Sequence, residues 1–237
     1  MRLKRVLTIA CGAALLAAVP AAPAFAGTLQ VNPVLLQINA GRRTATVTVR
    51  NEEATPVTIR AYALAWSQVD GEDRYEDTAA MVVSPPIFTI PAGGTQLVRV
   101  GLRTASGRPQ AYRLMIEEIP EANPAGGIRV ALRLNLPLYS GVEAGAPGDL
   151  RWSARPRPEG GWTVEASNRG TGYVRLDPAA AQAATGLEPG GNINFGTVLP
   201  GATRRWQLGA DSRILDRSRF DQIAGAGGHV AAQAGSD

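Results

Sequence analysis

The sequence contains very few of the residues that usually build reactive centres. Its 237 residues include one cysteine, Cys11, one histidine, His229, and one lysine, Lys4. Cys11 lies in a segment that we expect to be removed, so the remaining chain has no disulfide and no thiol chemistry. A single histidine without cysteine cannot build a zinc site of ordinary composition. We therefore expect no metal, no cofactor and no lysine-based catalysis.

The sequence motifs of common enzymes are missing as well. The chain has no G-x-S-x-G, no phosphate-binding glycine loop and no H-E-x-x-H. Glu117 and Glu118 are adjacent, so in a strand they point to opposite faces and cannot form an acid/base pair. The acidic stretch DGEDRYED, residues 70–77, lacks the spacing of a calcium loop and is typical of a solvated hairpin loop. We predict that the protein is not an enzyme.

After residue 26, the chain has neither a large excess of one charge nor a long apolar run. The net charge is +4, and Arg2, Lys4 and Arg5 supply three of these charges, so the rest of the chain carries about +1. This balance gives no case for a nucleic-acid partner. No later apolar run approaches the roughly 20 residues that span a bilayer. We expect a soluble product without membrane insertion.

The first 26 residues have the pattern of a cleavable signal peptide. A charged start, MRLKR, precedes the apolar run VLTIACGAALLAAV, and PAAPAFA ends in a small-x-small pattern. We expect cleavage between Ala26 and Gly27, and therefore export.

Short alternating segments separated by turn residues follow from Gly27 onward. About seven strands are predicted before Tyr139, and SGVEAGAPGD is the best candidate for a linker. A smaller β part with fewer clear strands follows, in which AAAQAA is a short helical candidate. The fold class is thus predicted as all-β, with one sandwich domain over residues 27–141 and a second over residues 142–237.

The most unusual segment is IRVALRLNLPLYSG, Ile128 to Gly141. As a strand it places six aliphatic side chains on one face: Ile128, Val130, Leu132, Leu134, Leu136 and Leu138. Pro137 lacks an N–H and favours an edge position, and a long apolar edge is an aggregation hazard. On periodicity alone, the alternative is that this row faces the chain's own core.

Several pieces in this order resemble the periplasmic chaperones that assemble pili and fimbriae by the chaperone–usher route. They are VNPVLLQINAGRRTATVTVRNEEATPVTIRAYALAW, VVSPPIFTIPAGGTQLVRVGLR, YRLMIEEIP and IRVALRLNLPLYSG, which together span Val31 to Gly141. NRGTGYVRL and VLPGATRRWQL resemble pieces of the family's second domain. The segments YRLMIEEIP and LPLY are similar to those of the divergent branch of the family that serves archaic and spore-coat-U-like pilins.

This resemblance implies two immunoglobulin-like sandwich domains in a boomerang arrangement, located in the periplasm. It implies pilin or fimbrial subunits and an outer-membrane usher as partners. The edge strand is lent to a subunit that lacks its own last strand, with the six aliphatic residues above as donors. Release then follows from replacement by another subunit's strand. Self-pairing in a homo-oligomer is a further way to cover the edge.

The chain departs from the family at the basic pair that anchors the subunit's terminal carboxylate. The first-strand region reads Pro33-Val34-Leu35-Leu36, and Asn135 stands near the position of the family's lysine. An arginine from a matching segment is then the candidate anchor: Arg113, Arg133 or Arg99. The alternative is that no carboxylate anchor exists. Two rival functions are a secreted structural subunit or adhesin, and an exported hydrolase.

Overall fold

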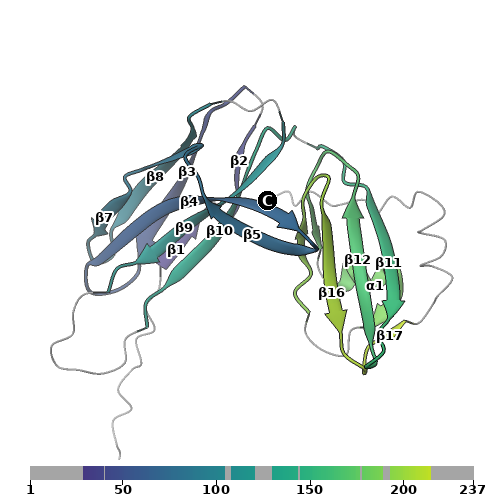
Figure 1. The fold of residues 1–237 in the computed structure, drawn as a ribbon. Coiled ribbons are helices and arrows are strands. Elements are labelled where there is room, and N and C mark those ends of the chain that lie inside the picture. The colour runs from purple at the N-terminus through teal and green to yellow at the C-terminus, as the bar shows by residue number, and fades with distance from the viewer. Residues whose placement is uncertain are drawn as a thin grey trace, which may run out of the picture.

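The structure, a computed structural model, describes residues 29–39, 41–104, 108–120, 130–143, 145–176, 178–188 and 193–214. The expected signal peptide, residues 1–26, and His229 lie outside these residues. Figure 1 shows two β-rich parts joined at an angle.

The first part is a sandwich of two sheets around one apolar core. One sheet has the strand order β1 (Leu29–Asn32), β3 (Thr44–Asn51), β8 (Thr95–Leu102) and β6 (Met81–Ser84). The other has the order β2 (Leu36–Ile38), β10 (Arg133–Ser140), β9 (Gln110–Glu118), β4 (Val57–Val69) and β5 (Glu72–Asp77), with β7 (Ile87–Ile90) also paired to β4. Alternating aliphatic residues of both sheets fill the space between them.

The second part contains shorter strands around a separate core that includes Trp152, Phe195 and Trp206. Its main sheet is β11 (Leu150–Pro156), β12 (Trp162–Asn168) and β16 (Thr203–Leu208). The other elements are the pairs β13 (Val174–Leu176) with β15 (Gly196–Val198) and β14 (Leu187–Glu188) with β17 (Arg213–Ile214), and the helix α1 (Pro178–Thr185). The predicted all-β sandwich class is confirmed, with this one short helix in the described residues.

Two segments differ from the prediction. The first-strand region around Pro33 is not one continuous strand but two, β1 and β2, which pair with opposite sheets. Pro33 lies between them and has no N–H to continue a ladder. The expected acidic loop is instead a hairpin of β4 and β5, because Asp70 and Gly71, at φ 56° and 87°, form a two-residue turn. β5 has polar or charged side chains on both faces, so it lacks the alternation of apolar and polar residues that predicts a strand.

This hairpin connects the two parts of the molecule. The Arg205 amide of β16 donates to the Gly71 carbonyl at 2.9 Å, and Arg204 forms an ion pair with Asp73 at 2.6 Å. The Gln68 side chain donates to the Thr197 carbonyl at 2.7 Å and accepts from the Leu199 amide at 2.9 Å. These contacts fix the hairpin tip against the edge of the second part.

Gly71 tests this connection, since a Cβ there would lie 2.5 Å from the Arg205 Cβ. We predict that Gly71→Ala separates the hairpin from β16 and raises the radius of gyration measured by solution X-ray scattering. The control is Gly41→Ala, which has a similar φ of 81° but nothing within 4 Å of its Cβ. Both variants lose about 1–2 kcal/mol to the left-handed backbone. Equal radii for the two variants would contradict the predicted role of the tip.

Candidate functional site

The candidate site is the open side of β10. This strand pairs with β9 along its whole length, from Arg133 opposite Glu117 to Ser140 opposite Gln110. On its other side β2 pairs only with Leu138–Ser140. Among the described residues, no strand lies beside Arg133–Pro137, so the predicted edge position is observed for this stretch.

Backbone groups of two residues point out of this edge. The Glu118 amide donates to the Leu132 carbonyl at 2.9 Å, which makes these two residues a hydrogen-bonded pair. Such pairs alternate along an antiparallel ladder, so the backbone N–H and C=O groups of Arg133 and Asn135 point away from β9. Pro137 occupies the next outward position, where its missing N–H breaks no ladder bond.

The six predicted donor residues do not share one environment. Ile128 lies outside the described residues, and the strand begins at Arg133 rather than at Ile128. Val130 is 78% exposed, whereas Leu136 and Leu138 are 6% and 0% exposed. Leu132 and Leu134 are half-buried, and Leu134 packs against the core that contains Leu136 and Leu138.

The periodic row therefore has an inner and an outer half. Leu136 and Leu138 face the chain's own core, as the alternative interpretation of the row predicts. Val130, Leu132 and Leu134 supply the apolar surface that is still accessible. Their role in binding stays a prediction.

Glu118 binds the backbone at Leu132, in the outer half of the row and just before β10 begins. The Leu132 amide donates to the Glu118 carboxylate at 3.2 Å, so this side chain takes the place of a backbone carbonyl at the end of the ladder. Glu118 is 9% exposed, whereas its neighbour Glu117 lies on the opposite face, as the sequence predicts. Val130 and Ala131 are thus outside the regular pairing with β9.

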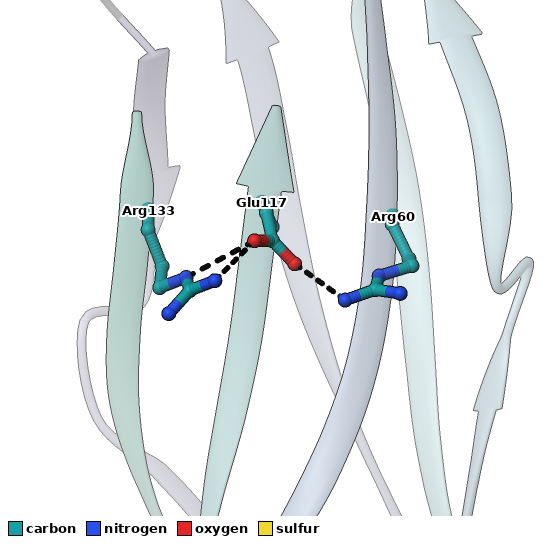
Figure 2. A network of polar contacts seen from close by, with 3 residues as sticks. All are labelled: Arg60, Glu117 and Arg133. Atoms are coloured by element: carbon teal, nitrogen blue, oxygen red, sulfur yellow. Dashed lines mark hydrogen bonds and ion pairs between the residues drawn. The ribbon is translucent and has the colours of Figure 1, made fainter. Parts of the chain in front are cut away.

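A row of three charges crosses the opposite, solvent-facing side of the sheet (Figure 2). Glu117 of β9 lies between Arg60 of β4 and Arg133 of β10 and forms an ion pair with each. The Arg60 contact is 2.8 Å, and the Arg133 Nε donates to Glu117 at 3.2 Å. Hydrogen bonds from Arg133, and then from Arg60, lower the pKa of the Glu117 carboxyl.

Arg113 lies further along the same face, beside the contact between the two parts. Its Cζ is 3.8 Å from the centre of the Trp66 ring and 5.7 Å from that of Tyr75, both cation–π distances. Its Nε is buried with no hydrogen-bond partner among the described residues. A cation held in this way has donor capacity for an anionic group.

Aromatic side chains complete the surroundings of Arg113. Trp66 and Tyr139 pack with Leu199 of the second part, and Tyr139 stacks on Tyr173 with ring centroids 3.7 Å apart. Burial raises the pKa of Tyr139 to about 12, so its hydroxyl is neutral at physiological pH. These aromatics are not among the site residues predicted from the sequence. The alternation of side chains along β4 and β10 places Trp66 and Tyr139 on a face of each strand. Whether these two faces meet depends on the register between the strands, which the sequence does not give.

The three candidate arginines therefore lie in different places. Arg113 is among the aromatics, Arg133 is paired with Glu117, and Arg99 is an exposed residue of β8 in the other sheet. The structure does not bring the three together.

The described residues also show neither a metal cluster nor a membrane-spanning helix. They contain no group of three or more metal-ligating side chains close enough to hold an ion. None of their helices is long and apolar enough to cross a membrane.

The lowered pKa of Glu117 predicts a pH effect on stability. The charged row stabilises the folded chain above the unfolded carboxyl pKa of about 4.3, and this stabilisation is lost as the pH falls through the lower folded pKa. We expect the difference in free energy of unfolding between the unaltered chain and Glu117→Gln to shrink from pH 6 to pH 3. Urea unfolding at each pH measures it. A constant difference would contradict the pKa direction.

Known proteins share both the sequence pattern and the fold described above. Residues 28–140 match the family model described as pili and flagellar-assembly chaperone, PapD N-terminal domain. No curated protein matches the chain.

Solved structures with the same fold cover more of the chain. One chain of the CsuC–CsuE chaperone–tip adhesion subunit pre-assembly complex, from archaic chaperone-usher Csu pili of Acinetobacter baumannii, is 23% identical. The match covers 76% of this chain and 87% of that chain, with a TM-score of 0.64. A chain of the Salmonella enterica SafA pilin complex with the SafB chaperone is 17% identical, with 76% and 84% covered and a TM-score of 0.56.

The E. coli chaperone DraB is 16% identical, with 77% and 85% covered and a TM-score of 0.51. These TM-scores show a shared fold, and the matched regions are longer than the family match, so they extend into the second part. Residues 28–140 thus resemble the N-terminal domain of the pili and flagellar-assembly chaperones, and the chain shares the fold of these solved structures.

Proposed function

We propose that this protein is a non-enzymatic periplasmic chaperone that holds pilus, fimbrial or coat-like subunits by strand addition. The observation that carries the proposal is the open edge of β10 over Arg133–Pro137, continued by the exposed Val130 and the half-buried Leu132. The family match and the fold shared with chaperones crystallised with subunits support it.

In this proposal, different residues of the same segment stabilise the chaperone and bind the subunit. Leu136 and Leu138 anchor β10 in the chaperone's own core, and the backbone groups of Arg133 and Asn135 offer a ladder to a subunit. Val130, Leu132 and Leu134 enter the subunit's groove. Burying three such side chains contributes about 4–8 kcal/mol before ordering costs.

The proposal includes the organisation of the chain and its route. Residues 1–26 act as a signal peptide, residues 27–141 form the subunit-binding domain, and residues 142–237 form the second domain. The separate cores of the two parts support this division. The loaded chaperone delivers its subunit to an outer-membrane usher, and replacement by another subunit's strand releases it. Pairing of two copies through β10 is the rival way to cover the edge in the free protein.

Arg113 is the best placed of the three candidate arginines to hold a terminal carboxylate. Trp66 and Tyr75 orient its guanidinium, and its buried Nε leaves a donor without a partner among the described residues. By contrast, Arg133 is already bound to Glu117, and Arg99 lies on the other sheet.

Subunit capture tests the role of the edge. We predict that Val130→Arg with Leu132→Arg abolishes co-purification of a pilin-like subunit from periplasm, because charged side chains cannot enter an apolar groove. Mass spectrometry identifies the captured chain. The substituted residues lie at the accessible end of the segment, so the variant is expected to remain folded by circular dichroism.

The matched control is Leu97→Arg, which changes a 51% exposed leucine of β8 on the other sheet. It is expected to capture the subunit normally. Capture by the double variant at the normal level would disprove strand donation by this segment. Unfolding of the double variant would instead place both residues in the chain's own core.

A second prediction concerns the anchor. Arg113→Gln is expected to reduce subunit affinity at least tenfold, as measured by competition between variants for the captured subunit, because a charge-assisted hydrogen bond is lost. Arg99→Gln is the control and is expected to bind normally. Full affinity of Arg113→Gln would show that the anchor is absent or lies elsewhere.

A further inference from the structure

The charged row in Figure 2 stops at the open edge with a positive charge. Reading across the strands, Arg60, Glu117 and Arg133 alternate in sign. Glu117 is 19% exposed at its side chain, whereas Arg60 and Arg133 are 52% and 59% exposed. One carboxylate serves two guanidinium groups, so the row carries a net charge of +1.

The next position in this row belongs to whichever strand pairs with β10. Directly opposed residues in neighbouring strands have Cβ atoms about 4.5–5.5 Å apart and share one face of the sheet. Arg133 has outward-pointing backbone groups, so an added strand would place a side chain beside it on the solvent-facing side. A carboxylate there would extend the alternation and balance the charge, whereas a cation would face Arg133 directly.

We propose that the strand received by β10 carries Asp or Glu on its solvent-facing side, opposite Arg133. This inference rests on the proposed function and adds a specificity element to it. Residues of the received strand on the opposite face meet Leu134 and are apolar. The strand is thus recognised by an acidic residue on one face and an apolar row on the other.

A second copy of this chain does not fit this requirement. The β10 side chains on the same face as Arg133 are those of Arg133, Asn135, Pro137 and the buried Tyr139, none of which is a carboxylate. Two such edges side by side would give Arg133 no carboxylate on the added strand, and Glu117 would stay its one negative neighbour among the described residues. Charge complementarity therefore favours a different chain as the occupant.

The probes for this inference are two synthetic peptides with blocked ends. Each has 11 residues that alternate valine and threonine, and they differ only in a central glutamate or glutamine that replaces a threonine. Fluorescence anisotropy with the full chain at low salt is expected to show about two- to fivefold tighter binding of the glutamate peptide. At 1 M salt this preference is expected to vanish, because the screening length falls to about 3 Å.

Variants of the row are expected to change the preference in opposite directions. Arg133→Gln removes the preference, because the incoming carboxylate loses its neighbour. Glu117→Gln increases it, because Arg133 is then free of its competing carboxylate. A merely structural role would weaken both peptides together and leave their ratio unchanged. Arg99→Gln, on the other sheet, is the control and keeps the normal ratio.

The outcomes separate this inference from the proposed function. Equal binding of the two peptides would overturn the charge inference and leave strand addition intact. Failure of both peptides to bind would overturn both proposals. Sedimentation at the assay concentration checks for self-association, and a dimer that closes β10 to both peptides would overturn the inference.

Discussion

The central constraint in this structure is that the backbone groups of a β-strand need partners on both sides. β10 is satisfied on one side by β9, whereas on the other side the described part of the chain offers only β2, which covers Leu138–Ser140. The backbone groups of Arg133 and Asn135 are therefore presented to a partner strand. An open edge of this kind is normally avoided because it promotes aggregation. Here the open stretch is short, and Pro137 and the charged Arg133 limit unspecific pairing.

The rest of the first part of the molecule holds this edge in place. Leu136 and Leu138 are packed into the core, and the Glu118 carboxylate binds the Leu132 amide where regular pairing ends. The β4–β5 hairpin then fixes the second part through Asp73 and Arg204. Because the tip contacts and the aromatic packing around Tyr139 lie at the same junction, the angle between the two parts and the surroundings of Arg113 depend on each other.

Sequence patterns were sufficient for the strands whose two faces differ in polarity. The row ending in Leu136 and Leu138 was predicted because aliphatic residues alternate with polar ones, and Pro137 correctly indicated an edge. β5 was missed because its side chains are polar on both faces, although the Asp70-Gly71 turn was a usable signal. The meeting of Arg113 with Trp66, and of Arg133 with Glu117, depends on the register between strands distant in sequence, which local patterns do not contain.

The most direct test of strand addition is hydrogen exchange at individual amides of β10, measured by NMR. In the free protein, the amides of Arg133 and Asn135 should exchange quickly, whereas those of Leu134 and Leu136, which point toward β9, should be protected. In a complex with a captured subunit, the account predicts strong protection of the Arg133 and Asn135 amides as well. Rapid exchange of these two amides in a fully formed complex would contradict it.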